Sequence, residues 1–247
     1  MKTLKGKIAL VTGGSRGIGR AIAERLAQDG ASIALSYVLS RQEAESVATG
    51  IRAGGGQAVA LHADMGNLHD VRSLFRGTLE NFGRLDILVN NAAIARLKPL
   101  IKVTEEDFAA TFAVNVRGPF FLMQEAARHM GRGGRIINIS SVGTRLRQAN
   151  ATNILYVAAK GALEQFTRVM AQELGPWGIT VNCVSPGFVE TDLVQAVPED
   201  RKQMVVDQTA LRRAGQPSDV AEAVAFLAGP AGRWVTGENI RATGGLE

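Results

Sequence analysis

A tyrosine and a lysine lie four residues apart in the segment YVAAK, from Tyr156 to Lys160. If this segment is helical, both side chains lie on one face, because residues i and i+4 are neighbours on a helix surface. A phenol has a pKa of about 10 and is a poor base at neutral pH, but a nearby ammonium favours the phenolate. The spacing therefore predicts an acid/base catalyst whose pKa is lowered by about one to three units. Considered separately, Tyr156 could be a buried phenol with a structural role, and Lys160 could be a surface charge.

A glycine-rich segment, TGGSRGIG, runs from Thr12 to Gly19 between a short apolar run and a helical pattern. Glycines allow a tight turn and a close backbone approach to a diphosphate, and the following helix points its first N–H groups at the phosphates. A plain strand-to-helix turn is the alternative, but the spacing TGxxxGxG in this context favours nucleotide binding. The residues expected to contact the cofactor here are Gly13, Ser15, Arg16, Gly17, Ile18 and Gly19.

The elements that must position these residues alternate along the chain, short apolar runs with longer helical patterns. This alternation predicts βαβ units and a Rossmann-type α/β fold, a doubly wound parallel sheet with helices on both faces. Without a linker or repeat, residues 1–247 are expected to form a single domain, and the irregular region at about 188–216 a lid over the substrate. The predicted strands are 8–12, 32–37, 57–62, 86–90, 135–140, 180–184 and 238–242; the predicted helices are 17–29, 41–52, 68–82, 106–130, 155–174 and 217–227.

Composition excludes several classes of function. With 46% hydrophobic and 21% charged residues, 247 residues can bury a normal core, and a net charge of +5 with scattered Lys and Arg predicts no nucleic-acid surface. The three histidines are dispersed, so no metal site is expected. A single cysteine excludes an internal disulfide. The sequence contains no uninterrupted run of about 18 apolar residues, so we expect no membrane span. We expect a cytoplasmic protein, because the apolar N-terminal run is also too short for a signal peptide.

Further motifs follow the glycine segment in a fixed order: Asp64 in HADMGN, NNAA at Asn90–Ala93, Asn115 in AVNVRG, INISS at Ile137–Ser141, YVAAK, and SPGFVET at Ser185–Thr191. Together they resemble the short-chain dehydrogenase/reductase family, and the resemblance covers nearly the whole chain. The pattern is most similar to the 3-oxoacyl-[acyl-carrier-protein] reductases. The same motifs also occur in many ketone reductases and polyol dehydrogenases, so they do not separate this branch from those enzymes.

The resemblance implies a role for each of four catalytic residues. Tyr156 protonates the carbonyl oxygen as hydride arrives from the nicotinamide, and Lys160 also binds the nicotinamide ribose. Ser141 hydrogen-bonds the substrate oxygen, and Asn115 holds a water that connects Lys160 to solvent, or bonds backbone at a helix bend. Ser141 lies fifteen residues before Tyr156, whereas about thirteen is common in the family. We interpret the segment RLRQANATNIL as a loop two residues longer than usual, with Ser140 and Thr144 as the alternatives to Ser141.

The end of the second predicted strand indicates which nicotinamide cofactor binds. An acidic residue there holds the ribose of NAD, and a basic residue accepts the 2′-phosphate of NADP. The window from Ser36 to Arg41 has no Asp or Glu and offers hydroxyls, including that of Tyr37, together with Arg41. Arg16 can also reach that phosphate, because a guanidinium suits a fork of two oxygens. We therefore expect NADP(H) to be preferred over NAD(H). The alternative is that Arg16 and Arg41 are solvated surface charges that do not contact the cofactor.

The remaining cofactor contacts are carried over from the family motifs. They are the adenine contacts Asp64 and Met65, then Asn91 and Ala92, and the nicotinamide-side residues Pro186, Gly187, Val189 and Thr191. Asp64 equally fits a turn residue next to the following helix. Two departures are expected to change local contacts without loss of chemistry: Ala93, where glycine is frequent, and Thr243, where Asp is usual.

The leading hypothesis is an NADPH-dependent carbonyl reductase that acts on a 3-oxoacyl thioester or similar ketone. One alternative is an NAD(P)-dependent dehydrogenase of a sugar or secondary alcohol, and another is a non-catalytic nicotinamide-binding sensor. The family usually forms homotetramers through its two long helices, here 106–130 and 155–174. Loop arginines, Arg96, Arg145 and Arg147, could receive an acidic carrier protein or a substrate carboxylate or phosphate, or simply form a basic rim.

Overall fold

The computed structural model describes residues 2–146, 151–192 and 197–246. Within them the strands form one parallel seven-stranded sheet in the order β3-β2-β1-β4-β5-β6-β7. The order reverses beside β1, which pairs with both β2 and β4, and open α/β sheets bind ligands at such a switch point. The strands are β1 (Ile8–Val11), β2 (Ser32–Tyr37), β3 (Ala58–His62), β4 (Ile87–Asn90), β5 (Arg135–Ile139), β6 (Thr180–Pro186) and β7 (Asn239–Ala242). The predicted doubly wound sheet in a single domain is confirmed.

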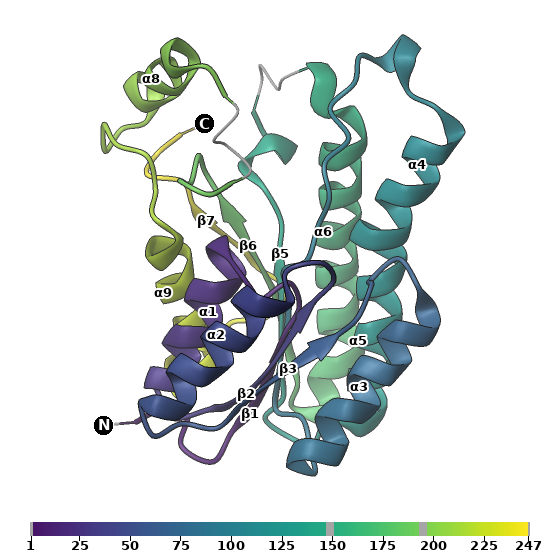
Figure 1. The fold of residues 1–247 in the computed structure, drawn as a ribbon, viewed down its shortest axis with the longest axis vertical. Coiled ribbons are helices and arrows are strands. Elements are labelled where there is room, and N and C mark those ends of the chain that lie inside the picture. The colour runs from purple at the N-terminus through teal and green to yellow at the C-terminus, as the bar shows by residue number, and fades with distance from the viewer. Residues whose placement is uncertain (1, 147–150, 193–196, 247) are drawn as a thin grey trace.

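Helices cover both faces of the sheet (Figure 1). The helices α1, α2 and α9 share one core cluster with the sheet, and α3, α5 and α6 share the other. In Figure 1, α8 lies at the top with the C-terminus, beyond the carboxyl end of β6. The helices are α1 (Gly17–Gln28), α2 (Arg41–Ala53), α3 (Leu68–Phe82), α4 (Glu105–Phe112), α5 (Gly118–His129), α6 (Ile154–Leu174), α8 (Glu199–Gln208) and α9 (Pro217–Ala228).

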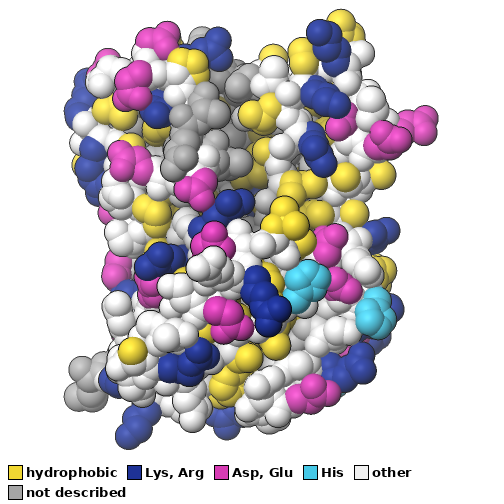
Figure 2. Space-filling view, viewed as in Figure 1, with side chains coloured by type: hydrophobic (Ala, Val, Ile, Leu, Met, Phe, Trp, Pro, Cys, Tyr) yellow, Lys and Arg dark blue, Asp and Glu magenta, His cyan; other side chains and the backbone are white. Residues whose placement is uncertain are grey.

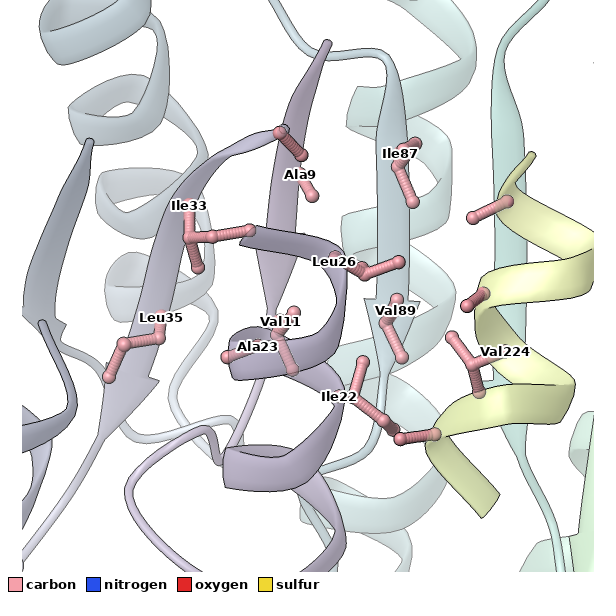
Figure 3. Close-up of a cluster of buried hydrophobic side chains, with 14 of the residues drawn as sticks. Ala9, Val11, Ile22, Ala23, Leu26, Ile33, Leu35, Ile87, Val89 and Val224 are labelled. Carbon is pink, nitrogen blue, oxygen red and sulfur yellow. The ribbon is translucent and has the colours of Figure 1, made fainter. Parts of the chain in front are cut away.

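Side chains of the central strands alternate between the two cores. In β1, Ala9 and Val11 point into the cluster with α1 and α9, drawn in Figure 3, while Leu10 points into the opposite cluster. All three are fully buried, as strands covered by helices on both faces must be. The continuous apolar runs seen in the sequence follow from this double burial. The sheet is therefore a rigid platform whose carboxyl ends carry the polar residues.

The surface carries charges of both signs, interspersed over the face drawn in Figure 2. Such a mixture gives no extended basic field for a nucleic acid on that face. Among the helices of the described chain, none combines the length and apolar character needed to cross a bilayer.

Two regions differ from the predicted elements. The helix expected over 106–130 is divided, because a π-helical turn, Ala113–Arg117, separates α4 from α5. A capping box of Thr104 and Asp107 begins α4. The region expected to be an irregular or helical lid contains α8, which has no buried residue. Residues 193–196 of that lid, like residues 147–150 of the loop before Tyr156, lie outside the described residues.

Candidate active site

The loop between β1 and α1 depends on its glycines. Gly13 and Gly17 have φ angles of 65° and 52°, in the left-handed region that glycine adopts without strain. A Cβ on Gly19 would lie 2.1 Å from the carbonyl oxygen of Gly13, so no other residue fits there. The N-cap residue, Arg16, gives α1 no side-chain cap, which leaves first-turn N–H groups for an anion. The cradle therefore fits the diphosphate of a dinucleotide.

Neighbouring strands fix the shape of this loop. The hydroxyl of Thr12 accepts hydrogen bonds from the backbone N–H groups of Asn91 and Ala92, at 3.0 and 3.1 Å. The Asn91 amide donates to the carbonyl oxygens of Thr12 and Gly13, at 3.0 and 3.1 Å. From β2, the Ser36 hydroxyl accepts from the Gly13 N–H at 3.1 Å. Thr12 and Ser36 were not among the predicted site residues, since their roles depend on partners 23 to 80 positions away.

The predicted loop residues otherwise lie where the sequence places them. Ser15 is buried, Ile18 packs against the core, and Arg16 is exposed within 3.6 Å of the Asp192 carboxylate. An exposed pair at this distance contributes little stability, so the Arg16 guanidinium can exchange Asp192 for a phosphate at small cost. Thr191 lies against Gly17, where a Cβ would be 3.4 Å from the threonine methyl. The segment after β6 thus meets the glycine loop directly.

The segment after β6 is held by β7 and the loop before α9. Pro186 ends β6, and the Gly187 N–H donates to the carbonyl oxygen of Ala242 at 3.0 Å. A Cβ on Gly187 would lie 2.8 Å from the Cα of Thr243, so glycine is required at 187. Thr243 is the position at which the family motif usually has Asp. Val189 is buried and pairs with Gly215 in an isolated parallel bridge. Any contact of Val189 with the cofactor therefore uses its backbone.

The residues expected to contact the adenosine of the cofactor differ in their exposure. The Asp64 carboxylate accepts a hydrogen bond from the Gly66 N–H at 2.7 Å, so Asp64 stabilises the turn before the next helix, as its alternative interpretation predicts. Met65 is buried. The Tyr37 ring is also buried, edge-to-face with His62 at 5.6 Å between ring centroids. Arg41 is exposed at the first position of α2, where its guanidinium can turn toward a phosphate.

Tyr156 and Lys160 share the first turns of α6, which begins at Ile154. The Lys160 nitrogen lies 5.5 Å from the centroid of the Tyr156 ring, so the two side chains are neighbours as the spacing predicts. Lys160 is only 1% exposed, and its nitrogen donates to the Ile139 carbonyl oxygen at 2.6 Å. The carboxyl end of β5 therefore holds the ammonium in place beside the Tyr156 ring.

The predicted lowering of the tyrosine pKa is wrong for this structure. Burial raises the pKa of Tyr156 to about 12, because desolvation disfavours the phenolate. Burial also lowers the pKa of Lys160 to about 8. The ammonium lies by the ring and bonds a backbone carbonyl, so it does not offset the desolvation of the phenol. Spacing alone could not reveal how strongly the fold desolvates both groups.

Among Ser140, Ser141 and Thr144, the structure distinguishes Ser141. The hydroxyls of Ser140 and Thr144 both donate to the Glu164 carboxylate at 2.7 Å. The Ser141 oxygen instead accepts from the Gly143 N–H at 3.1 Å, which leaves its own proton to be donated elsewhere. Ser141 also lines a pocket of about 520 Å³, with Val142, Thr144, Arg145, Ser185, Arg241 and Leu246.

Asn115 lies in the π-helical turn between α4 and α5 and is fully buried. Its amide oxygen accepts from the Ile94 N–H at 2.9 Å, and its amide nitrogen donates to the Ile94 carbonyl at 2.8 Å. The side chain thus ties the turn to the segment after β4, as the helix-bend alternative predicts. The proton relay through Asn115 stays a prediction.

A family model described as Enoyl-(Acyl carrier protein) reductase matches residues 13–247. An uncharacterized oxidoreductase of Methylorubrum extorquens is 45% identical, with 100% of both chains covered. The 3-oxoacyl-[acyl-carrier-protein] reductase FabG of Staphylococcus aureus is 39% identical over 97% of this chain and 98% of its own. A short chain dehydrogenase from Burkholderia cenocepacia, solved with NADP, superposes with a TM-score of 0.93 at 45% identity, covering 99% of both chains.

The chain belongs to the short-chain dehydrogenase/reductase family. It is an NAD(P)-dependent oxidoreductase, and the glycine cradle fits the nicotinamide dinucleotide that the family uses. Two further members bear on substrate. A hydroxynaphthalene reductase-like protein of Metarhizium guizhouense is 40% identical over 99% of this chain and 96% of its own. The angucycline C-6 ketoreductase LanV, solved with NADP, has a TM-score of 0.92 at 42% identity, covering 99% of this chain and 96% of its own.

Proposed function

We propose that this oxidoreductase reduces a ketone with NADPH. The observation that carries the proposal is the placement of three groups near the carboxyl end of β5. They are a Tyr156 phenol that stays protonated at neutral pH, the buried Lys160 ammonium, and a Ser141 hydroxyl that lines the pocket with its proton available. This set suits a carbonyl oxygen that gains negative charge and then a proton.

Each group has a distinct role in the proposed reaction. The bound nicotinamide supplies the hydride. The Ser141 hydroxyl donates a hydrogen bond to the ketone oxygen and stabilises the charge that develops there. Tyr156 gives its proton to that oxygen, which becomes the alcohol. Lys160, with a pKa of about 8, is mostly charged at neutral pH, and the Ile139 carbonyl holds its ammonium beside the phenol ring.

The preference for NADPH over NADH is part of the proposal. Arg16 and Arg41 are exposed and lie at the two segments expected to border the adenosine ribose, the glycine loop and the start of α2. No acidic side chain occurs from Ser36 to Arg41 to bind a ribose hydroxyl. The NADP bound to the Burkholderia and LanV relatives supports the same choice.

We propose a 3-oxoacyl thioester or similar ketone as the substrate, in line with the motif pattern and the FabG relative. A ketone on an aromatic ring system is the second candidate, favoured by the hydroxynaphthalene reductase-like and angucycline ketoreductase relatives. A cytoplasmic homotetramer with residues 188–216 as a lid completes the proposal. α8 supports the lid, because it has no buried residue to anchor it to the body of the protein.

The test is oxidation of NADPH and of NADH, followed optically, with four sets of compounds. These are 3-oxoacyl thioesters, hydroxylated ring ketones, enoyl thioesters and, for the reverse direction, sugars or secondary alcohols, whose oxidation is followed as reduction of NADP+ or NAD+. We expect turnover of a ketone with NADPH. Turnover of enoyl thioesters alone, or of sugars alone, would replace ketone reduction with another reaction. Cofactor binding without turnover of any compound would favour the sensor.

A further inference from the structure

One carboxylate gathers three hydroxyl groups beside the pocket. Glu164 accepts hydrogen bonds from Ser140 and Thr144, both at 2.7 Å, and more weakly from Ser185 at 3.5 Å, whose hydroxyl also lies 2.8 Å from the Asn239 amide oxygen. All three bonds go to the same oxygen, Oε1. The donors come from three segments, the residue after β5, the short turn Val142–Thr144, and β6.

These three segments surround Ser141. Ser140 precedes it, Thr144 ends the turn that follows it, and Ser185 lines the same pocket. Glu164 comes four residues after Lys160 and eight after Tyr156 on α6, so the same helix face carries all three side chains. The helix that presents the phenol and the ammonium therefore also holds the segment that presents the serine.

The chemistry of a carboxylate fixes the direction of each bond. An ionised carboxylate only accepts, and a hydroxyl has a single proton to donate. The two short bonds to Glu164 use the protons of Ser140 and Thr144, which compete with longer contacts to the Lys160 carbonyl at 3.4 Å and the Ser141 carbonyl at 2.9 Å. Ser141, which lacks this bond, keeps its proton for a ligand. An amide in place of the carboxylate could donate as well as accept, so the hydroxyls would no longer have one required orientation.

The position of Glu164 also balances charge in this part of the core. Glu164 and Lys160 act on the pKa of the buried Cys183 thiol in opposite directions, so both charges lie near it. Within the described residues, none of the ion pairs found involves Glu164. Its partners are hydroxyl groups, which suit orientation better than a mobile surface pair.

We propose that Glu164 is a positioning residue that fixes the segment 140–144 and thereby makes Ser141 the hydroxyl that contacts the ketone oxygen. The proposal rests on the proposed ketone reduction. Its effect on turnover must therefore pass through Ser141, whereas a general structural role would not.

A double-mutant cycle tests this dependence. Glu164→Gln is expected to lower kcat by up to about 100-fold with little change in KM for NADPH, as misplaced catalytic groups do. In a Ser141→Ala background the same change is expected to have no further effect, because the hydroxyl it positions is gone. Glu173→Gln, an exposed residue of the same helix, serves as the control with no loss. Equal losses in both backgrounds, or unchanged kcat in Glu164→Gln, would overturn the proposal.

Amide hydrogen exchange gives a readout that needs no substrate. The N–H groups of Gly143, Arg145 and Leu146 are bonded within this segment, to Ser141 Oγ and the Val142 carbonyl. In Glu164→Gln we expect them to exchange about tenfold faster, the loss of roughly one hydrogen bond to a charged group, while β1 is unchanged. If Glu164→Gln does not fold, Ser140→Ala removes one of the two short bonds to Glu164 and should give the same change more weakly.

The two experiments separate the two proposals. Faster exchange in Glu164→Gln with a wild-type protein that reduces no ketone would end the proposed function and leave the fixed segment supported. Unchanged exchange with an active wild type would end the role of Glu164 and leave ketone reduction intact.

Discussion

The cofactor half of the site and its substrate half are held together by different kinds of interaction. In the cofactor half, the glycine loop and Asn91, the fit depends on backbone sterics and on bonds to main-chain groups. In the substrate half, Ser140–Arg145 with Glu164 and Ser185, side-chain hydroxyls and one carboxylate set the geometry. Backbone fit leaves little freedom of sequence, while a hydroxyl network can be rebuilt around a different ligand. The difference explains how one family can keep its cofactor and vary its substrate.

The largest expected effect belongs to the catalytic phenol, where the two halves meet. Tyr156→Phe should lower kcat for ketone reduction by about a thousandfold, because the developing alkoxide loses its proton donor. The affinity for NADPH, measured by fluorescence titration, should stay within about threefold of wild type, since the cradle is untouched. Retained turnover in this variant would show that another group donates the proton.

The cofactor half can be broken by a single methyl group. Gly19→Ala places a Cβ 2.1 Å from the Gly13 carbonyl and 2.5 Å from the Asn91 amide, so the loop must open. We expect NADPH affinity to fall by about 100-fold or more, while the fold survives. Gly50→Ala, in α2 with open space around the added Cβ, is the matched control and should stabilise by about 0.5–1 kcal/mol. Equal affinity in both variants would contradict the steric account of the loop.

The buried lysine predicts a dependence of stability on pH. Its pKa is about 8 in the folded chain against 10.5 for an ordinary lysine, so between these values the unfolded chain binds the extra proton. Stability from this group therefore rises with pH from about 8 to about 10.5, by on the order of 3 kcal/mol, and Lys160→Met lacks the rise. Urea unfolding of both proteins across this window measures the difference. Parallel pH curves would show that Lys160 is not desolvated as the structure indicates.

The smallest expected effect concerns the choice of nicotinamide. Arg41→Ala should raise the KM for NADPH by about tenfold and leave that for NADH unchanged, because only NADPH carries the 2′-phosphate. Arg16→Ala should act in the same direction after loss of its exposed pair with Asp192. Steady-state kinetics with both cofactors measure the ratio. An equal change for NADH and NADPH would assign these arginines a role unrelated to the phosphate.

The two halves also differ in how far the sequence predicts them. The glycine loop and the pairing of Tyr156 with Lys160 depend on local spacing, and the structure places both as expected. The pKa of Tyr156, the π-helical turn at Asn115 and the hydroxyl network of Glu164 depend on partners distant in sequence. Ile94 lies 21 positions before Asn115, and Ser140 lies 24 before Glu164. Only the packed sheet brings such pairs together.

The measurement that tests the central claim most directly is an ultraviolet titration of Tyr156. The chain has two tyrosines, so the difference between wild type and Tyr156→Phe isolates this phenol. The account predicts no phenolate from Tyr156 between about pH 6 and 9.5, because burial raises its pKa to about 12 and keeps the proton that a ketone oxygen would receive. A phenolate that forms with a midpoint near pH 7 to 8 would contradict it, since Tyr156 would then act as a base lowered by Lys160.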